Sequence, residues 1–185
     1  MKRLLYRGRK FCAKPASEDG FTLIEVLVAM TILTVLVGIS VSSLSGNLPK
    51  WRLRGATDEI VTVFQKARAL SVKKNKWVIV QFSGVNTPAT CAVRIYLDKN
   101  DNGVVDAADT RMHNMLLASR FKAAYVRSVT NGAATATTSI MLSPDGTIKP
   151  STLTMPISIV MASTSAQAPR TFTVVVERSG LARVK

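Results

Sequence analysis

Residues 21–41 read FTLIEVLVAMTILTVLVGISV, an apolar run in which Glu25 is the one charged residue. A helix rises ~1.5 Å per residue, so about 20 such residues cover the ~30 Å hydrocarbon core of a bilayer. The run therefore predicts a membrane-spanning helix, which we place at residues 21–45. A carboxylate inside a bilayer is costly unless it is shallow, protonated or paired. Glu25 is therefore expected to have a specific partner.

The segment before this run is basic. Six Lys and Arg residues and two acidic residues, Glu18 and Asp19, precede Phe21. By the positive-inside rule, this end stays in the cytoplasm and the rest of the chain is exported, as in a single-pass membrane protein. A plain signal anchor or a cleaved secretory signal would also explain the pattern, and Ser43-Leu44-Ser45 before Gly46 is an acceptable cleavage site. Against the secretory signal, both the basic region and the apolar run are longer than usual.

Composition narrows the possible function classes. With 185 residues, 47% of them hydrophobic, the chain suits one modest domain plus an extra element and is not disordered. Two cysteines, Cys12 and Cys91, and the single His113 provide no Cys/His metal cluster. We therefore expect neither enzymatic activity nor a required cofactor. The formal charge of +14 favours partners with negative potential, such as nucleic acid, anionic lipid or acidic protein.

A second helical pattern follows, and we place an amphipathic helix at residues 46–76. Its apolar residues recur at i, i+3, i+4 and i+7. They are Leu53, Ala56, Ile60, Val63, Phe64, Ala67 and Leu70. This face is expected to pack on a folded domain. Gly38, Gly46 and Pro49 interrupt the join with the first helix, so a bend, local melting or a break remains open there.

From Trp77 onward the pattern is typical of strands. Short apolar or alternating runs are separated by Ser, Thr, Asn, Gly and Pro. They cover residues 77–82, 91–97, 112–117, 121–127, 139–142, 155–161 and 171–178. Ser143-Pro-Asp-Gly-Thr147 predicts a turn. We expect an antiparallel sheet against the amphipathic helix, and hence an α+β fold with a β-rich head at residues 77–185. In it, Trp77 would begin a core strand, Cys91 would be buried and His113 would be structural.

Gly20-Phe21-Thr22-Leu23-Ile24-Glu25, with a basic leader before it and an apolar helix after it, resembles the prepilin signature of type IV pilins and of type II secretion pseudopilins. The resemblance implies that a prepilin peptidase removes residues 1–20 as a leader peptide and that the new N-terminus, Phe21, is N-methylated. It also implies that Glu25 recruits the incoming subunit to a growing filament. After cleavage, the Phe21 amine of the same or a neighbouring subunit would lie about one helical turn from Glu25 and would neutralise it.

The long helix followed by short strands resembles the H-type pseudopilin and the related minor pilins. This implies a subunit at the tip of a type IV pilus or a type II secretion pseudopilus, anchored in the bacterial inner membrane with a periplasmic head. Its partners would be other minor and major pilins or pseudopilins. Many major pilins carry a C-terminal disulfide loop, whereas only Cys91 would remain here after processing. The resemblance leaves open which of the two machines the chain serves.

Residues 98–109 resemble a calcium loop of the EF-hand type. Oxygen-bearing side chains occupy loop positions 1, 3, 5, 9 and 12, and Gly103 stands at position 6. The side chains are Asp98, Asn100, Asn102, Asp106 and Asp109. Position 12 is Asp, which has a shorter reach than the usual Glu, and the flanks read as strands. The alternatives are therefore a low-affinity Ca²⁺ site and a solvated turn.

The C-terminus carries a basic cluster of Arg178, Arg183 and Lys185. Ala182-Arg-Val-Lys185 resembles the Gly-Arg-x-Arg tail of minor pilins that bind DNA during natural transformation, with Ala and Lys at two of its positions. This resemblance implies an alternative function, DNA uptake through phosphate contacts that weaken with salt. The other interpretation is a basic surface that contacts acidic neighbouring subunits.

Overall fold

The computed structural model describes residues 20–149, 154–165 and 171–185, and it divides the chain into two compact units, Met1–Ser42 and Ser43–Lys185. Helix α1 (Leu23–Lys74) belongs partly to each unit, and the boundary falls inside it. In the first unit, the span Leu23–Ser40 has a mean hydropathy of 2.4 and is entirely unburied. This segment is long and apolar enough to cross a membrane.

Helix α1 is one element in the backbone from Leu23 to Lys74, with Pro49 inside it. The sequence left open a break or local melting near Gly38, Gly46 and Pro49, and neither is present. A proline removes one backbone donor and crowds the preceding turn. Strong helical patterns on both sides of Pro49 outweigh that local cost.

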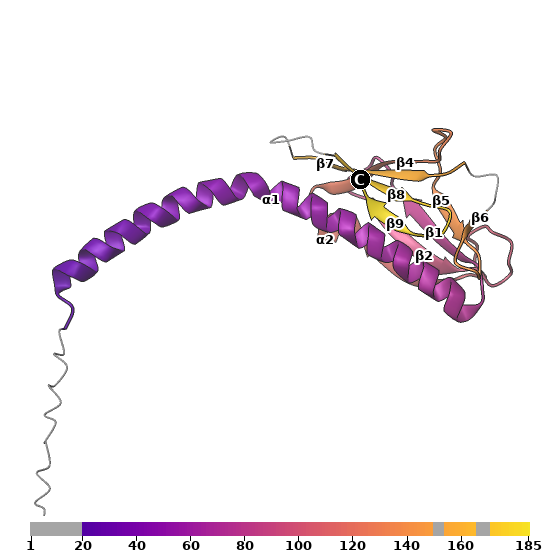
Figure 1. The fold of residues 1–185 in the computed structure, drawn as a ribbon, viewed down its shortest axis with the longest axis horizontal. Helices are drawn as coiled ribbons and strands as arrows, with labels where there is room; N and C mark the ends of the chain where they lie inside the picture. The colour runs from indigo at the N-terminus through magenta and orange to yellow at the C-terminus, as the bar shows by residue number, and fades with distance from the viewer. Residues whose placement is uncertain (1–19, 150–153, 166–170) are drawn as a thin grey trace, which may run out of the picture. The chain divides into compact units, whose positions relative to one another are not determined.

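The head consists of two antiparallel sheets (Figure 1). Among the described residues, the first sheet has the order β3-β2-β1-β5-β6 and the second has the order β4-β7-β8-β9. The first contains β1 (Val78–Ser83), β2 (Ala92–Leu97), β3 (Thr110–Leu116), β5 (Ser139–Leu142) and β6 (Ile148–Lys149). The second contains β4 (Ala124–Thr130), β7 (Ile157–Ser163), β8 (Thr171–Val176) and β9 (Ala182–Val184). A short helix, α2 (Leu117–Arg120), joins β3 to β4.

The expected α+β fold is confirmed, but the single sheet is replaced by two. The expected runs all become strands, with shifted ends. Trp77 lies directly before β1, and β4 starts at Ala124 because a turn at residues 121–123 follows α2. β6 and β9 were not expected. They contain two and three residues, too few to show a strand period.

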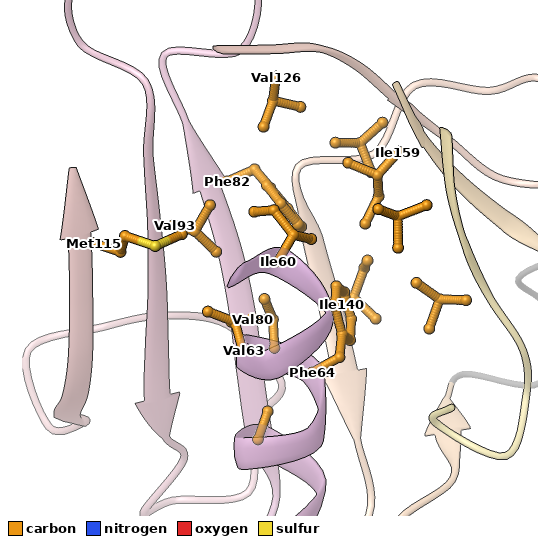
Figure 2. Close-up of a cluster of buried hydrophobic side chains, with 14 of the residues drawn as sticks. Ile60, Val63, Phe64, Val80, Phe82, Val93, Met115, Val126, Ile140 and Ile159 are labelled. Carbon is orange, nitrogen blue, oxygen red and sulfur yellow. The ribbon is translucent and has the colours of Figure 1, made fainter. Parts of the chain in front are cut away.

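One core joins the helix to both sheets (Figure 2). Ile60, Val63 and Phe64 of α1 meet Phe82 of the first sheet and Ile159 of the second in this cluster. The predicted apolar face is confirmed, since all of its members are buried except Leu70, which is partly buried. Burying each large apolar side chain contributes about 1.5–3 kcal/mol. The head is thus held together by the C-terminal part of α1.

Candidate functional site

The Gly20-Phe21 bond lies directly before helix α1 and is freely approachable. Gly20 and Phe21 are outside the helix, and Phe21 is 83% exposed. A Cβ added at Gly20 would meet no atom within 4 Å. Among the described residues, nothing packs over the predicted cleavage point, so a peptidase would find a non-helical and open substrate there.

Thr22 caps the helix that carries Glu25, a role that sequence reasoning missed. The Glu25 backbone N–H is 3.3 Å from Thr22 Oγ1 and also donates to the Thr22 carbonyl at 3.1 Å. Thr22-Leu-Ile-Glu25 has the spacing of a capping box, in which a Thr side chain satisfies a free N–H of the first turn and an acidic residue follows three positions later. That T-x-x-E spacing was the signal available in the sequence. The cap fixes Glu25 in the first turn of α1.

The large apolar side chains of the first unit are exposed in the described chain. Between Leu23 and Ile39, each large apolar side chain has at least 43% of its surface exposed. Exposed apolar surface on this scale marks a segment that contacts lipid or other proteins. A helix with such a surface, capped by Thr22 and carrying Glu25, is suited to insertion into a membrane and to packing against other helices.

The acidic loop is held between two paired strands. β2 ends at Leu97 and β3 begins at Thr110, and these two residues are register partners. The pairing brings the two ends of the loop together, as the 3.2 Å hydrogen bond from the Lys99 N–H, at position 2, to Asp109 Oδ1, at position 12, shows. Asp98 is fully buried, and its Oδ2 accepts the Gly103 N–H at 2.8 Å.

Three side chains of the loop converge on one atom. The side-chain amides of Asn100 and Asn102 lie 2.7 and 2.8 Å from Asp106 Oδ2. The bond from Asn100 is the main cause of the lowered pKa of Asp106, and the Ala108 N–H lowers this pKa further. In the described part of the chain, no three His, Cys, Asp or Glu side chains are grouped so as to hold a metal. Any cation here would therefore depend on amide and carbonyl oxygens as well.

A second turn, Ser143–Thr147, shows the expected Pro-Asp-Gly geometry. Asp145 accepts the Ser143 hydroxyl, the Thr147 hydroxyl at 2.7 Å and the Thr147 N–H at 2.8 Å. These hydrogen bonds, led by that of Ser143, lower the pKa of Asp145 to about 2. This turn joins β5 to β6, and its polar groups form hydrogen bonds with one another.

The basic tail is spread along a hairpin. Arg178 follows β8 in the turn, whereas Arg183 lies on β9 and Lys185 follows it. Alternation along a strand places the side chains at 183 and 185 on the same side. Arg183 forms an ion pair of 2.8 Å with Glu177. The structure therefore places Arg183 and Lys185, two of the three predicted residues, on the same side. One of them, Arg183, is paired with the acidic Glu177.

Cys91 lies directly before β2, and His113 lies on β3. Cys91 is buried as expected, its Sγ accepts the Val126 N–H at 3.3 Å, and burial raises the pKa of its thiol. His113 lies on β3, where burial lowers its pKa and the charge of Lys66 lowers it further. A protonated thiol lacks the nucleophilic thiolate.

Two models of known protein families match parts of the chain. A family model described as "Type II transport protein GspH" matches residues 56–180, more than half of the chain. A second model, "Prokaryotic N-terminal methylation motif", matches residues 16–41. No curated protein matches the chain.

Two solved structures are similar in fold. One is the crystal structure of the Pseudomonas aeruginosa type IV minor pilin FimU in space group P21, with 14% identity, a TM-score of 0.50, and coverage of 74% of this chain and 90% of that one. The other is FimU from the same organism in space group P65, with 12% identity, a TM-score of 0.47, and coverage of 71% and 91%. At such low identity the first structure supports the fold alone.

Proposed function

We propose that this chain, which belongs to the type II transport protein GspH family, is a prepilin that is cut after Gly20 and assembles as a minor subunit into a type IV pilus or a type II secretion pseudopilus. The family and the prepilin motif make it a membrane-anchored pilin or pseudopilin subunit. The observation that carries the finer proposal is the unburied apolar helix from Leu23 to Ser40, preceded by an open Gly20-Phe21 bond.

The processing step is a hydrolysis followed by methylation. Water adds across the Gly20-Phe21 peptide bond and leaves a carboxylate on Gly20 and a free amine on Phe21. Transfer of a methyl group from a sulfonium donor then forms an N–CH₃ bond on this amine as the donor's S–CH₃ bond breaks. The methylated amine is still basic, so it stays cationic. The released leader takes six basic and two acidic residues with it and leaves 19 basic against nine acidic residues in the subunit.

Assembly then follows from two features of the first unit. The amine of Phe21, from the same or an adjacent subunit, pairs with Glu25 one turn into the helix and removes the cost of a lone carboxylate in lipid. The apolar side chains between Leu23 and Ile39 pack against the helices of other pilins or pseudopilins. The subunit acts by polymerisation and not by catalysis, with its N-terminus on the cytoplasmic side of the inner membrane and its head in the periplasm.

The test is the mass of the mature N-terminus. The protein is purified from membranes of bacteria that have, or lack, an active prepilin peptidase, and its N-terminal peptide is sequenced by mass spectrometry. We expect N-methylated Phe21 when the peptidase is present and the intact leader when it is absent. Gly20→Val should block cleavage by adding a branched side chain at the cut bond, whereas the matched control Gly38→Ala, within the helix, should be cut normally.

Two outcomes would contradict this proposal. Retention of residues 1–20 in the presence of active peptidase would show that the motif is not a substrate. An N-terminus at Gly46 would show instead that a secretory signal had been removed, and the chain would then be an exported protein without a pilin helix.

A further inference from the structure

One oxygen of Asp98 has an unusual environment. Asp98 is fully buried, and its Oδ1 has no hydrogen-bond partner among the described residues. Its other oxygen accepts the Gly103 N–H at 2.8 Å, so the carboxylate faces the loop at residues 98–109. A buried carboxylate oxygen without a partner is costly, and native structures rarely leave one without a ligand or water.

The loop backbone is already shaped around this carboxylate. Gly103 adopts a φ of 74°, in the left-handed region, and this places its N–H on Asp98. In a calcium loop of the EF-hand type, the glycine at position 6 provides the sharp turn that directs the preceding and following ligands inward. The paired residues Leu97 and Thr110 fix the two ends of the loop.

The polar side chains of the loop also converge. Asn100, Asn102 and Asp106 meet at Asp106 Oδ2. Rotation of the Asn100 amide by half a turn about its last bond would direct its oxygen, in place of its nitrogen, toward the same region. Asn102 Oδ1 already accepts the Val104 N–H at 2.8 Å, which leaves it a second lone pair for a cation. Asp109 closes the loop by accepting the Lys99 and Asp106 N–H groups at 3.2 and 3.1 Å. Its oxygens keep further lone pairs for a cation.

We propose that residues 98–109 form a Ca²⁺ site in the head. The ligands are carboxylate, amide and carbonyl oxygens, the hard donors that Ca²⁺ prefers. They come from Asp98, Asn100, Asn102, Asp106 and Asp109, together with the carbonyl of Val104 at loop position 7. The three carboxylates are not grouped around one point in the described chain, so binding would draw them together. The unpartnered Oδ1 of Asp98 would gain a cation as its partner. The Asn100 amide would turn its oxygen to the metal, and Asn102 Oδ1 would keep the Val104 N–H on one lone pair.

The acidic residues of the loop favour a cation there, although the protein as a whole is basic. Four of the 11 acidic residues of the chain lie in this one loop, at Asp98, Asp101, Asp106 and Asp109. Asp101, at position 4, is paired with Lys76 at 2.9 Å and is not a ligand in the proposed site. The others remain available. The site belongs to the head and does not depend on how the N-terminus is processed.

The test uses the full chain in detergent micelles after treatment with a chelator. Isothermal titration calorimetry with CaCl₂ should show one saturable site with a Kd of about 0.1–1 mM, the range of extracellular calcium modules. Asp106→Asn should weaken binding at least about tenfold, because it removes an anionic ligand. Asp101→Asn is the matched control: the same change in the same loop should alter the Kd by less than about threefold.

Folding of the variants is checked by circular dichroism and by thermal unfolding. Because Asp106 is exposed, its variant should keep the wild-type spectrum. A Ca²⁺ concentration that saturates wild type should raise the midpoint of wild type and of Asp101→Asn more than that of Asp106→Asn. Absence of saturable heat up to about 10 mM Ca²⁺, well above the range expected of such modules, would overturn the proposal. Equal weakening by both substitutions would overturn it too, since this would indicate diffuse attraction to an acidic loop.

Discussion

At the scale of single residues, Glu25 has two roles that can be separated. It occupies the third position of the Thr22-capped turn, and it lies exposed on an apolar span. The cap uses the Glu25 backbone N–H, which a substitution leaves in place. The carboxylate is therefore free for the intramembrane pairing that we propose with the Phe21 amine.

Glu25→Gln should leave insertion and cleavage unchanged but lower incorporation into filaments. The amide keeps the length and the helix propensity of the side chain and removes only the charge. We expect the amount of this subunit in sheared filaments to fall at least about tenfold, because an unpaired ammonium of Phe21 in lipid is costly. The measurement is an immunoblot of sheared filaments against the membrane fraction, with Thr34→Val as a control on the same helix. Normal incorporation of Glu25→Gln would show that the pairing argument is wrong.

At the scale of elements, the C-terminal part of α1 is the structural centre of the head. Its buried face meets both sheets, and the rings of Phe64 and Phe82 lie 6.4 Å apart, within the range of favourable aromatic pairs. The opposite face carries exposed Arg52, Arg54 and Lys66. Stability should therefore depend strongly on which face of the helix is changed.

Phe64→Ala should lower the free energy of unfolding of the head by about 3–5 kcal/mol, the cost of a large cavity in a core. Phe64 is fully buried, whereas Trp51 on the same helix is 65% exposed. Trp51→Ala should therefore change this free energy by less than about 0.5 kcal/mol. Urea unfolding of the full chain in micelles, followed by circular dichroism, measures both. Equal losses would contradict the observed packing of α1.

At the scale of the whole molecule, the basic charge is spread widely. The formal charge is +14, but the predicted DNA-binding tail is divided between a turn residue, Arg178, and the pair Arg183 and Lys185. Glu177 neutralises part of this pair. Nothing in the fold therefore favours the tail over other basic surfaces, and DNA uptake stays a prediction from the sequence alone.

A gel-shift series with duplex DNA over increasing salt tests this prediction. We expect Arg183→Ala plus Lys185→Ala to bind DNA no more weakly than the control Lys73→Ala plus Lys74→Ala, since each variant loses two exposed charges. Non-specific binding follows the number of phosphate contacts and weakens steeply with salt. A selective loss in the tail variant, with a salt slope smaller by about two, would instead support the DNA alternative.

The sequence by itself determined the N-terminal apolar helix, the buried face of α1, the α+β class and the prepilin motif. Each of these rests on local order: a run of apolar residues, a helical period, an alternating period, or adjacent residues such as Gly20 and Phe21. Such signals are contained within one segment of chain, so no knowledge of the neighbouring segments is needed to read them.

Only the tertiary structure decided how the strands divide and which polar groups meet. β4 pairs with β7 and not with β3, which splits the expected sheet in two. The partnership of Leu97 with Thr110 brings the Lys99 N–H to Asp109, and the β8–β9 pairing brings Arg183 to Glu177. Strand partners are chosen by packing and hydrogen bonding between segments distant in the chain, and a strand's own period does not specify its partner.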